Sequence, residues 1–172
     1  IPKDRAYIIQ KFQNISDSTL IVYVIGAHFS HPKQGQTYPI ASIATLKKAL
    51  LDNGIGSSDK IILMADTNDN FPDKPTSDST FMNAILDQKA KNVQGAGANQ
   101  TCCCNDSSQK NGPFPFKTDR IISNNMGTGG DATAVNLTDI FGSVVGQCPP
   151  SNNPSCILGE MHKPVLWTVN VN

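Results

Sequence analysis

Two short apolar runs along the chain have the length of buried strands. The first extends from Leu20 to Phe29 and is rich in β-branched and aromatic residues. The second extends from Asp59 to Asp66 and has a nearly continuous aliphatic middle. The first run does not alternate between apolar and polar residues, which is typical of a strand buried on both faces. We therefore expect two central strands of a sheet.

A helical pattern separates the two runs. Pro39 lies near its start and Gly54 just after its end, which matches the usual punctuation of a helix. Lys47 and Lys48 fall on the polar face. Strand, helix and strand in this order predict an α/β unit. The apolar positions at helical spacing are Ile40, Ile43, Ala44, Leu46, Leu50 and Leu51.

Weaker patterns complete the expected elements. Tyr7 to Phe12 alternates weakly and predicts a strand, and Ser79 is a candidate cap for a helix that reaches about Ala90. Residues 117–123 predict a short strand and 165–171 a closing one. We find no internal repeat and no domain boundary, so residues 1–172 are expected to form a single domain.

Composition and charge narrow the function classes. Of the 172 residues 38% are hydrophobic, which suffices for a proper core. The 14 basic and 14 acidic residues balance, which counts against tight polyanion binding but permits brief contact with one phosphate. No stretch has the length and apolarity of a transmembrane segment. Because the chain opens at Ile1 without a signal peptide, either a signal was removed or the chain is a fragment of something longer.

The cysteine spacing favours disulfides over a metal site. A metal site needs two close pairs whose thiolates converge on one ion, whereas this chain has a triplet and two distant cysteines. Two cysteines of the triplet can pair with the distant ones, which leaves one to bond another chain or a missing segment. Residues 93–112 are expected to form a Cys-containing surface loop. The cysteines are Cys102, Cys103, Cys104, Cys148 and Cys156.

Four Asn-x-Ser/Thr sequons also indicate an extracellular protein. Two of them flank the cysteine triplet, in a segment that is expected to be exposed. Disulfides and N-glycans both belong to the secretory pathway. We therefore expect a secreted glycoprotein. The candidate glycosylation sites are Asn14, Asn99, Asn105 and Asn136.

Polar clusters follow four of the expected strands. They are centred on His28, on Asp66 and Asn68, on Asp119 and on His162. Polar residues at the strand ends of an α/β protein converge on one rim, where ligands bind. A His–Asp pair can deprotonate a water, a second histidine can stabilise phosphate oxygens and an asparagine can hold the phosphate. The clusters therefore predict a phosphate-cleaving site.

The order of these clusters resembles the endonuclease/exonuclease/phosphatase superfamily. The order is His, then Asp-x-Asn, then Asp-Arg-Ile, then His-x-Pro-Val. The superfamily includes pancreatic deoxyribonuclease, inositol polyphosphate phosphatases and bacterial sphingomyelinases. The resemblance implies an α/β fold in which two mixed sheets form a β-sandwich flanked by helices, the four-layer deoxyribonuclease-like arrangement.

The resemblance also implies a role for each matching residue. His28 corresponds to a phosphate-contacting histidine, while Asp66 and Asn68 correspond to the pair that orients the nucleophile and holds the phosphate. Asp119 corresponds to the acid that pairs with the general-base histidine, here His162. Members of the superfamily use Mg²⁺ or a similar divalent cation held by carboxylates.

The chain departs from the superfamily pattern at the expected metal site. An aspartate normally precedes the final histidine, but Met161 occupies that position here. Glu160 lies one residue further away and is a weak substitute, because on a strand it points to the opposite face. The metal-binding glutamate of the superfamily lies in an N-terminal region that has no counterpart here. We therefore expect the C-terminal two-thirds of the fold, with Asp66 and Asn68 as the remaining metal ligands.

Simpler interpretations of the same residues stay open. His28 is alternatively a hydrogen-bonded core histidine, and residues 66–70 an ordinary turn in which Asp and Asn bond their own backbone. Asp119 and Arg120 are alternatively a surface ion pair. His31 is expected to be a loop residue without a catalytic role, and Trp167 a core residue.

Two functions follow from this sequence. The first is metal-dependent phosphodiester hydrolysis by a secreted protein, with a nucleic acid or a phospholipid head group as substrate. The second is a catalytically inactive homologue that serves as an extracellular structural or binding module. The neutral charge, the surplus cysteine and Met161 favour the second, and the ordered polar clusters favour the first.

Overall fold

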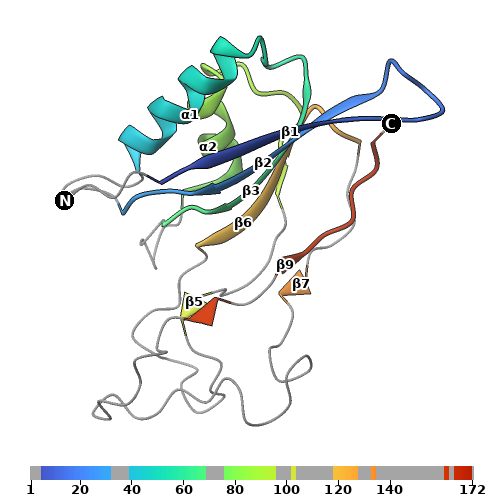
Figure 1. Cartoon of the computed structure of the whole chain (residues 1–172). Helices are drawn as coiled ribbons and strands as arrows, with labels where there is room; N and C mark the ends of the chain where they lie inside the picture. Colours follow the sequence, from blue (N-terminus) through green and yellow to red (C-terminus); the bar gives the residue numbers. More distant parts are fainter. Residues whose placement is uncertain are drawn as a thin grey trace, which may run out of the picture.

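The computed structural model describes residues 5–31, 39–68, 76–95, 118–127 and 165–171, together with the strand segments 102–103, 133–134 and 161–162. Its main part is a five-stranded sheet of order β1-β2-β3-β6-β4, with two helices on one face (Figure 1). These elements are β1 (Tyr7–Gln13), β2 (Ile21–His28), α1 (Ile40–Asp52), β3 (Lys60–Asp66), α2 (Asp78–Ile85), β4 (Gln94–Gly95) and β6 (Asp119–Asn124). Two small two-stranded sheets pair β5 (Cys102–Cys103) with β8 (Met161–His162), and β7 (Thr133–Ala134) with β9 (Val165–Leu166).

The predicted α/β unit is confirmed. β2 and β3 are parallel neighbours, and α1 connects them, beginning at Ile40 as the apolar spacing indicated. β1 and β6 pair antiparallel with the outer sides of β2 and β3, so the sheet is mixed. The expectation of a mixed α/β architecture is therefore met. None of the helices in the described ranges is long and apolar enough to cross a membrane.

Strand register separates the residues of the sheet onto two faces. Ile25, Leu63 and Ile122 lie opposite one another on β2, β3 and β6, and each is at most 1% exposed beneath the helices. Side chains of neighbouring positions point to the opposite face. On that face Ile8 is 69% exposed and Met64 is 45% exposed. The helices therefore cover only one side of the sheet.

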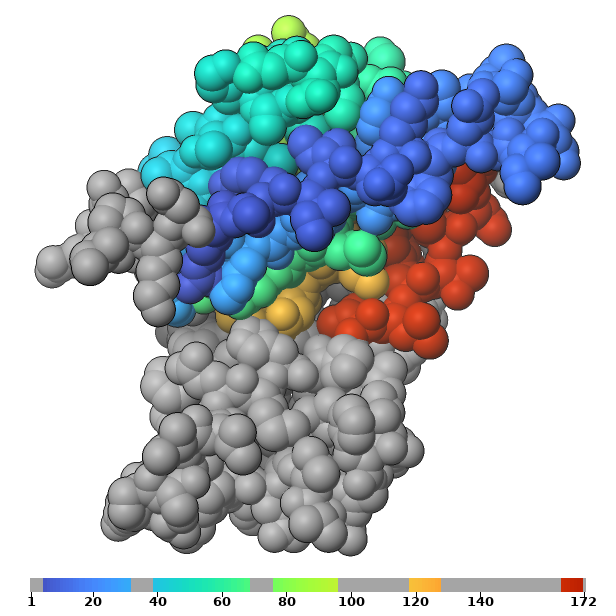
Figure 2. Space-filling view, viewed as in Figure 1, coloured from blue at the N-terminus to red at the C-terminus, as the bar shows by residue number. Residues whose placement is uncertain are grey.

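This one-sided cover corrects the expectation that the strand at 20–29 is buried on both faces. In β2 only Ile25 is fully buried, and most other residues of the strand are half-buried. Figure 2 shows the β1–β2 hairpin, coloured in shades of blue, along the outer surface of the molecule. The aliphatic residues of β2 that face the helices thus pack in the core. Those on the opposite face are explained by their preference for the strand conformation.

The second helix differs from the prediction at both ends. Ser77, not Ser79, is the N-cap, and its hydroxyl oxygen accepts a hydrogen bond from the Thr80 N–H at 3.1 Å. The helix ends at Ile85 rather than near Ala90, because Asp87 and Gln88 adopt positive φ angles of 57° and 61°. Positive φ is incompatible with a continuing right-handed helix.

The segment expected to be a surface loop begins with the edge strand of the five-stranded sheet. Gln94 and Gly95 form β4 and pair with Ser123 and Ile122 of β6. The backbone of Cys102 and Cys103 forms β5, while the other three cysteines lie outside the described residues. The predicted disulfides and their partners therefore stay predictions.

The closing strand is shorter than predicted. Only Val165 and Leu166 form β9, and the rest of 165–171 contains no further strand beyond an isolated bridge at Val169. The Gly127 N–H donates to the Asn170 carbonyl at 3.1 Å and fastens this segment to the end of β6. Trp167, expected in the core, is half-buried.

Asn124 is a buried polar residue that the sequence pattern did not reveal. Its Nδ2 donates to the carbonyls of Ser57 and Asp59 at 3.0 and 2.9 Å, and its Oδ1 accepts from the Lys91 N–H at 2.7 Å. It is fully buried and connects β6 to the loop before β3.

We expect Asn124→Leu to destabilise the fold by roughly 3 kcal/mol, because three backbone groups lose their hydrogen-bond partner. Urea unfolding measures this change. Asn125→Gly is the matched control, since Asn125 is partly exposed, has a φ of 55° that glycine tolerates, and its side chain donates to the Ser58 carbonyl. Equal losses in the two variants would contradict the structural role of Asn124.

Candidate active site

Three of the predicted site residues lie side by side across the sheet. His28 is the register partner of Asp66 between β2 and β3, and Asp66 is the register partner of Asp119 between β3 and β6. Residues directly opposite one another on paired strands share a face. Ala65, the residue before Asp66, is buried with the core, so this row lies on the face away from the helices.

His28 and Asp66 are in direct contact. The His28 Nε2 atom lies 2.9 Å from Asp66 Oδ2, with the histidine side chain 54% exposed and the aspartate side chain 13% exposed. Asp66 Oδ1 accepts a hydrogen bond from the Asn68 N–H at 2.9 Å. A carboxylate bonded to one ring nitrogen fixes the orientation of the imidazole and directs the other nitrogen elsewhere. His28 is therefore an exposed, oriented histidine and not a core residue.

Asn68 joins the ends of β2 and β3. It is 5% exposed and has a φ of 48°, and its Nδ2 donates to the Phe29 carbonyl at 2.5 Å. The same carbonyl accepts from Arg5 Nη1 at 3.1 Å, and the Phe29 N–H donates to the Asp66 carbonyl at 2.9 Å. Three hydrogen bonds thus hold the backbone of Phe29, the residue that follows His28. Residues 69 and 70 of the turn considered for residues 66–70 lie outside the described residues, but its start shows the expected bond from a backbone N–H to the Asp66 side chain.

Asp119 is half-buried at the start of β6. The Thr118 hydroxyl donates to Asp119 Oδ2 at 3.2 Å. The Thr118 carbonyl accepts from both the N–H and the hydroxyl of Thr67, each at 2.7 Å. These bonds extend the pairing of β3 and β6 by one further residue pair. They thereby fix the spacing between Asp66 and Asp119.

Arg120 does not form the surface ion pair that was considered for it. Its side chain is 2% exposed, and its Nη1 atom lies 3.1 Å from Asp78 Oδ1 and bonds to the Thr76 carbonyl. Its guanidinium carbon also lies 5.0 Å from the centroid of the Phe81 ring. The surface ion-pair interpretation is therefore wrong for Arg120. Strand alternation gives the reason, because the residue after Asp119 must point to the helix face.

The remaining predicted residues are placed only in part. The backbone of His162 lies in β8 opposite Cys102, outside the five-stranded sheet, and Met161 lies opposite Cys103. Glu160 lies outside the described residues, as do the sequons at Asn99, Asn105 and Asn136. The pairing of His162 with Asp119 therefore stays a prediction.

The described residues do not form a metal site on their own. Within the described ranges no group of three histidine, cysteine, aspartate or glutamate side chains is arranged to hold a cation. Both oxygens of Asp66 accept hydrogen bonds from protein groups, and the Asn68 amide donates to Phe29. A hard cation such as Mg²⁺ needs several oxygen ligands at once. These bonds hold Asp66 and Asn68 in place, and the two residues alone do not supply the number of oxygen ligands that such a cation needs.

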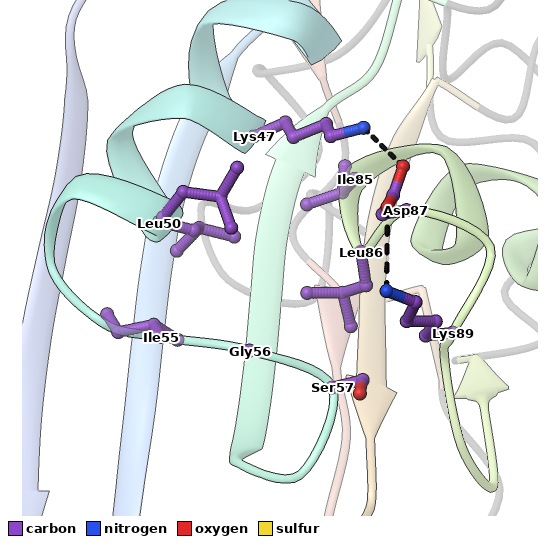
Figure 3. A pocket seen from close by; sticks show the side chains of 10 residues that line it. Lys47, Leu50, Ile55, Gly56, Ser57, Ile85, Leu86, Asp87 and Lys89 are labelled. Carbon is purple, nitrogen blue, oxygen red and sulfur yellow. Dashed lines mark hydrogen bonds and ion pairs between the residues drawn. The ribbon is translucent and has the colours of Figure 1, made fainter.

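A separate cavity of about 210 Å³ lies between the ends of α1 and α2 (Figure 3). Leu50, Ile55 and Leu86 form part of its apolar wall, and Asp87 contacts the ammonium groups of Lys47 and Lys89 at 2.6 and 3.7 Å. The two ammonium groups hold the pKa of Asp87 below its usual value, mainly through the hydrogen bond from Lys47. The cavity lies beside the loop that precedes β3, whereas Asp66 ends that strand. It is therefore distinct from the candidate site.

Comparison with solved structures identifies the fold in which His28, Asp66 and Asp119 lie side by side. No family model matches the chain, and no curated protein matches it by sequence. The chain is similar to an endonuclease/exonuclease/phosphatase from Bacteroides vulgatus, with a TM-score of 0.56 and 13% identity over 98% of this chain and 56% of that one. It is similar to a mannosyl-6-phosphatase from Bacteroides thetaiotaomicron, with a TM-score of 0.56 and 10% identity over 96% of this chain and 57% of that one.

A third similar structure contains metal. It is a beta toxin from Staphylococcus aureus with bound magnesium ions, with a TM-score of 0.50 and 11% identity over 98% of this chain and 55% of that one. The chain therefore spans little more than half of each of these proteins. At these identities the comparison establishes the fold, which is that of the endonuclease/exonuclease/phosphatase structures, as the order of the polar clusters predicted.

We expect Asn68→Ala to destabilise the protein by roughly 2 kcal/mol, because it removes the bond to Phe29 and places alanine at positive φ. Asn68→Gly removes the same bond but tolerates the backbone angle, so its loss should be smaller. Urea unfolding of both variants separates the two contributions. If both variants were as stable as the wild type, the Asn68–Phe29 bond would have no role in holding the ends of β2 and β3 together.

Proposed function

We propose that this chain carries catalytic residues of a phosphodiester hydrolase at the ends of β2 and β3 and the start of β6. The observation that supports the proposal is the row of His28, Asp66 and Asp119, in which the His28–Asp66 contact measures 2.9 Å. The fold supports a phosphoester substrate, since one structure of this fold is named a mannosyl-6-phosphatase. Because fold alone does not fix function, the side chains of the row carry the argument.

In this proposal His28 binds the phosphate and Asp66 holds His28. The carboxylate fixes the imidazole at Nε2, so that Nδ1 can donate to a non-bridging phosphate oxygen as negative charge develops there. Asp119 lies one strand further along and would accept a hydrogen bond from the catalytic base, for which the resemblance proposes His162, and stabilise it once that base is protonated. That base removes a proton from the attacking water. Nucleic acid and phospholipid head groups remain the candidate substrates.

A divalent cation belongs to the proposal, although the described residues do not form its site. The magnesium in the beta toxin structure supports it for the fold. When bound, the cation would neutralise charge on the phosphate. Its ligands would have to include groups outside the described residues, because the described residues hold no cluster of three histidine, cysteine, aspartate or glutamate side chains that could bind it.

The experiment is hydrolysis of bis(p-nitrophenyl) phosphate, a generic phosphodiester, with Mg²⁺ present. We expect His28→Ala and Asp66→Asn each to lower kcat/KM by about 100-fold or more, since loss of one charge-stabilising or acid–base group typically has an effect of that size. His31→Ala is the matched control, because His31 follows β2 by three residues and is expected to have no catalytic role. It should keep wild-type activity.

The catalytically inactive extracellular module is the competing function. Both oxygens of Asp66 are committed to protein contacts, and Met161 replaces the expected metal-binding aspartate, which are the observations that favour it. Wild-type protein without turnover in the presence of Mg²⁺ would support the module and contradict the enzyme.

Metal removal gives an independent test of the cofactor. We expect a chelator such as EDTA to abolish hydrolysis and excess Mg²⁺ to restore it, because uncompensated negative charge on the phosphate raises the barrier. The readout is the rate of p-nitrophenolate release. Unchanged rates in the chelator would remove the cation from the proposal and leave the His–Asp row in place.

A further inference from the structure

The tip of the β1–β2 hairpin is an exposed segment that the proposed function does not use. Residues 11–19 are all exposed, and the Ile15 side chain extends fully into solvent. Figure 1 shows this hairpin projecting from the sheet. The segment contains Asn14-Ile15-Ser16, the one sequon of the chain that lies within the described residues.

The sequon lies in a turn that the asparagine side chain itself closes. Asn14 Oδ1 accepts hydrogen bonds from the N–H groups of Ser16 and Asp17 at 2.7 and 3.1 Å. The amide oxygen is thus directed back to the chain, and the amide nitrogen occupies the opposite corner of the side chain. The Asn14 N–H is bonded to the Leu20 carbonyl at 3.0 Å, so the turn is defined by the hairpin itself.

We propose that Asn14 is the site of an N-linked glycan. The donor is an oligosaccharide on a lipid diphosphate. Asn14 Nδ2 forms a bond to C1 of the first sugar, and the bond between that C1 and the diphosphate breaks. One amide proton passes to a base of the transferase, and the lipid diphosphate leaves. Neither oxidation nor reduction occurs.

The position of Asn14 on the hairpin would leave His28, Asp66 and Asp119 accessible when the glycan is present. Asn14 precedes β2 and His28 ends it, so the eight-residue strand separates the glycan from the row. At about 3.3 Å per residue this separation is roughly 23 Å. The glycan would also lie beside Phe12, which is 55% exposed, and Ile15. It would thereby shield apolar side chains that otherwise favour association.

The test is expression of the full chain with a secretory leader in a eukaryotic host. Peptide mass analysis of cell-associated and secreted protein, before and after treatment with peptide N-glycosidase, reports occupancy at each sequon. We expect the Asn14 peptide to carry a glycan, and the enzyme to convert Asn14 to aspartate. Phosphodiesterase activity plays no part in this readout, so its absence leaves the glycan proposal unaffected.

Matched variants distinguish the modification from a folding defect. Ser16→Ala should abolish the glycan while keeping the turn, because Asn14 Oδ1 bonds to the backbone N–H of Ser16 and not to its hydroxyl. Ser16→Thr should retain the glycan, as should Thr19→Ala, which changes the hairpin outside the sequon.

Two results would overturn the proposal. The first is an unmodified Asn14 peptide in protein recovered from the secretory pathway. The second is binding of the hairpin to phosphatidylcholine vesicles that Ile15→Ser abolishes, since a tip that inserts into a lipid surface cannot carry a bulky sugar. That result would assign the exposed apolar tip to a membrane.

Discussion

The in-register pairing of β2, β3 and β6 is the constraint on which the candidate site depends. His28, Asp66 and Asp119 share a face only because their strands align without offset. A slip of one residue along any strand would turn that strand's residue to the helix side. The buried row of Ile25, Leu63 and Ile122 opposes such a slip, because the same shift would move a core residue into solvent. Core packing and site geometry are therefore two consequences of one register.

A second group of contacts holds the ends of these strands. Phe29 connects the rim to the core, since its backbone bonds to Asn68, Arg5 and Asp66 while its ring stacks on Phe81 with centroids 6.2 Å apart. Phe81 in turn lies beneath the Arg120 guanidinium. Through these contacts α2 supports the rim from the helix side, although it contributes no residue to the row.

Much of this arrangement follows from the sequence, and the exceptions have physical reasons. The two central strands and α1 are predictable because their apolar spacing is strong and local. The row of His28, Asp66 and Asp119 is predictable because polar residues at adjacent strand ends meet at one edge. Arg120 and Asn124 are not, since their burial depends on hydrogen-bond partners 33 to 67 residues away in the chain. The early end of α2 also escaped prediction, because positive φ at Asp87 and Gln88 has no hydrophobic signature.

The side chains of Asp66 and Asn68 organise the strand ends through hydrogen bonds. They form no cation site among the described residues. The chain spans little more than half of the structures that share its fold, and a cation at this site would need ligands beyond the described residues. The row would then act on the phosphate while other groups hold the metal.

The most direct test of the row is an NMR titration of the chain with dimethyl phosphate, followed through backbone amide shifts. Binding requires no turnover, so the result is informative for an active enzyme and for an inactive homologue. The account predicts that perturbed amides cluster at His28, Asp66 and Asp119. Shifts centred on the cavity between α1 and α2, or none at all, would contradict it.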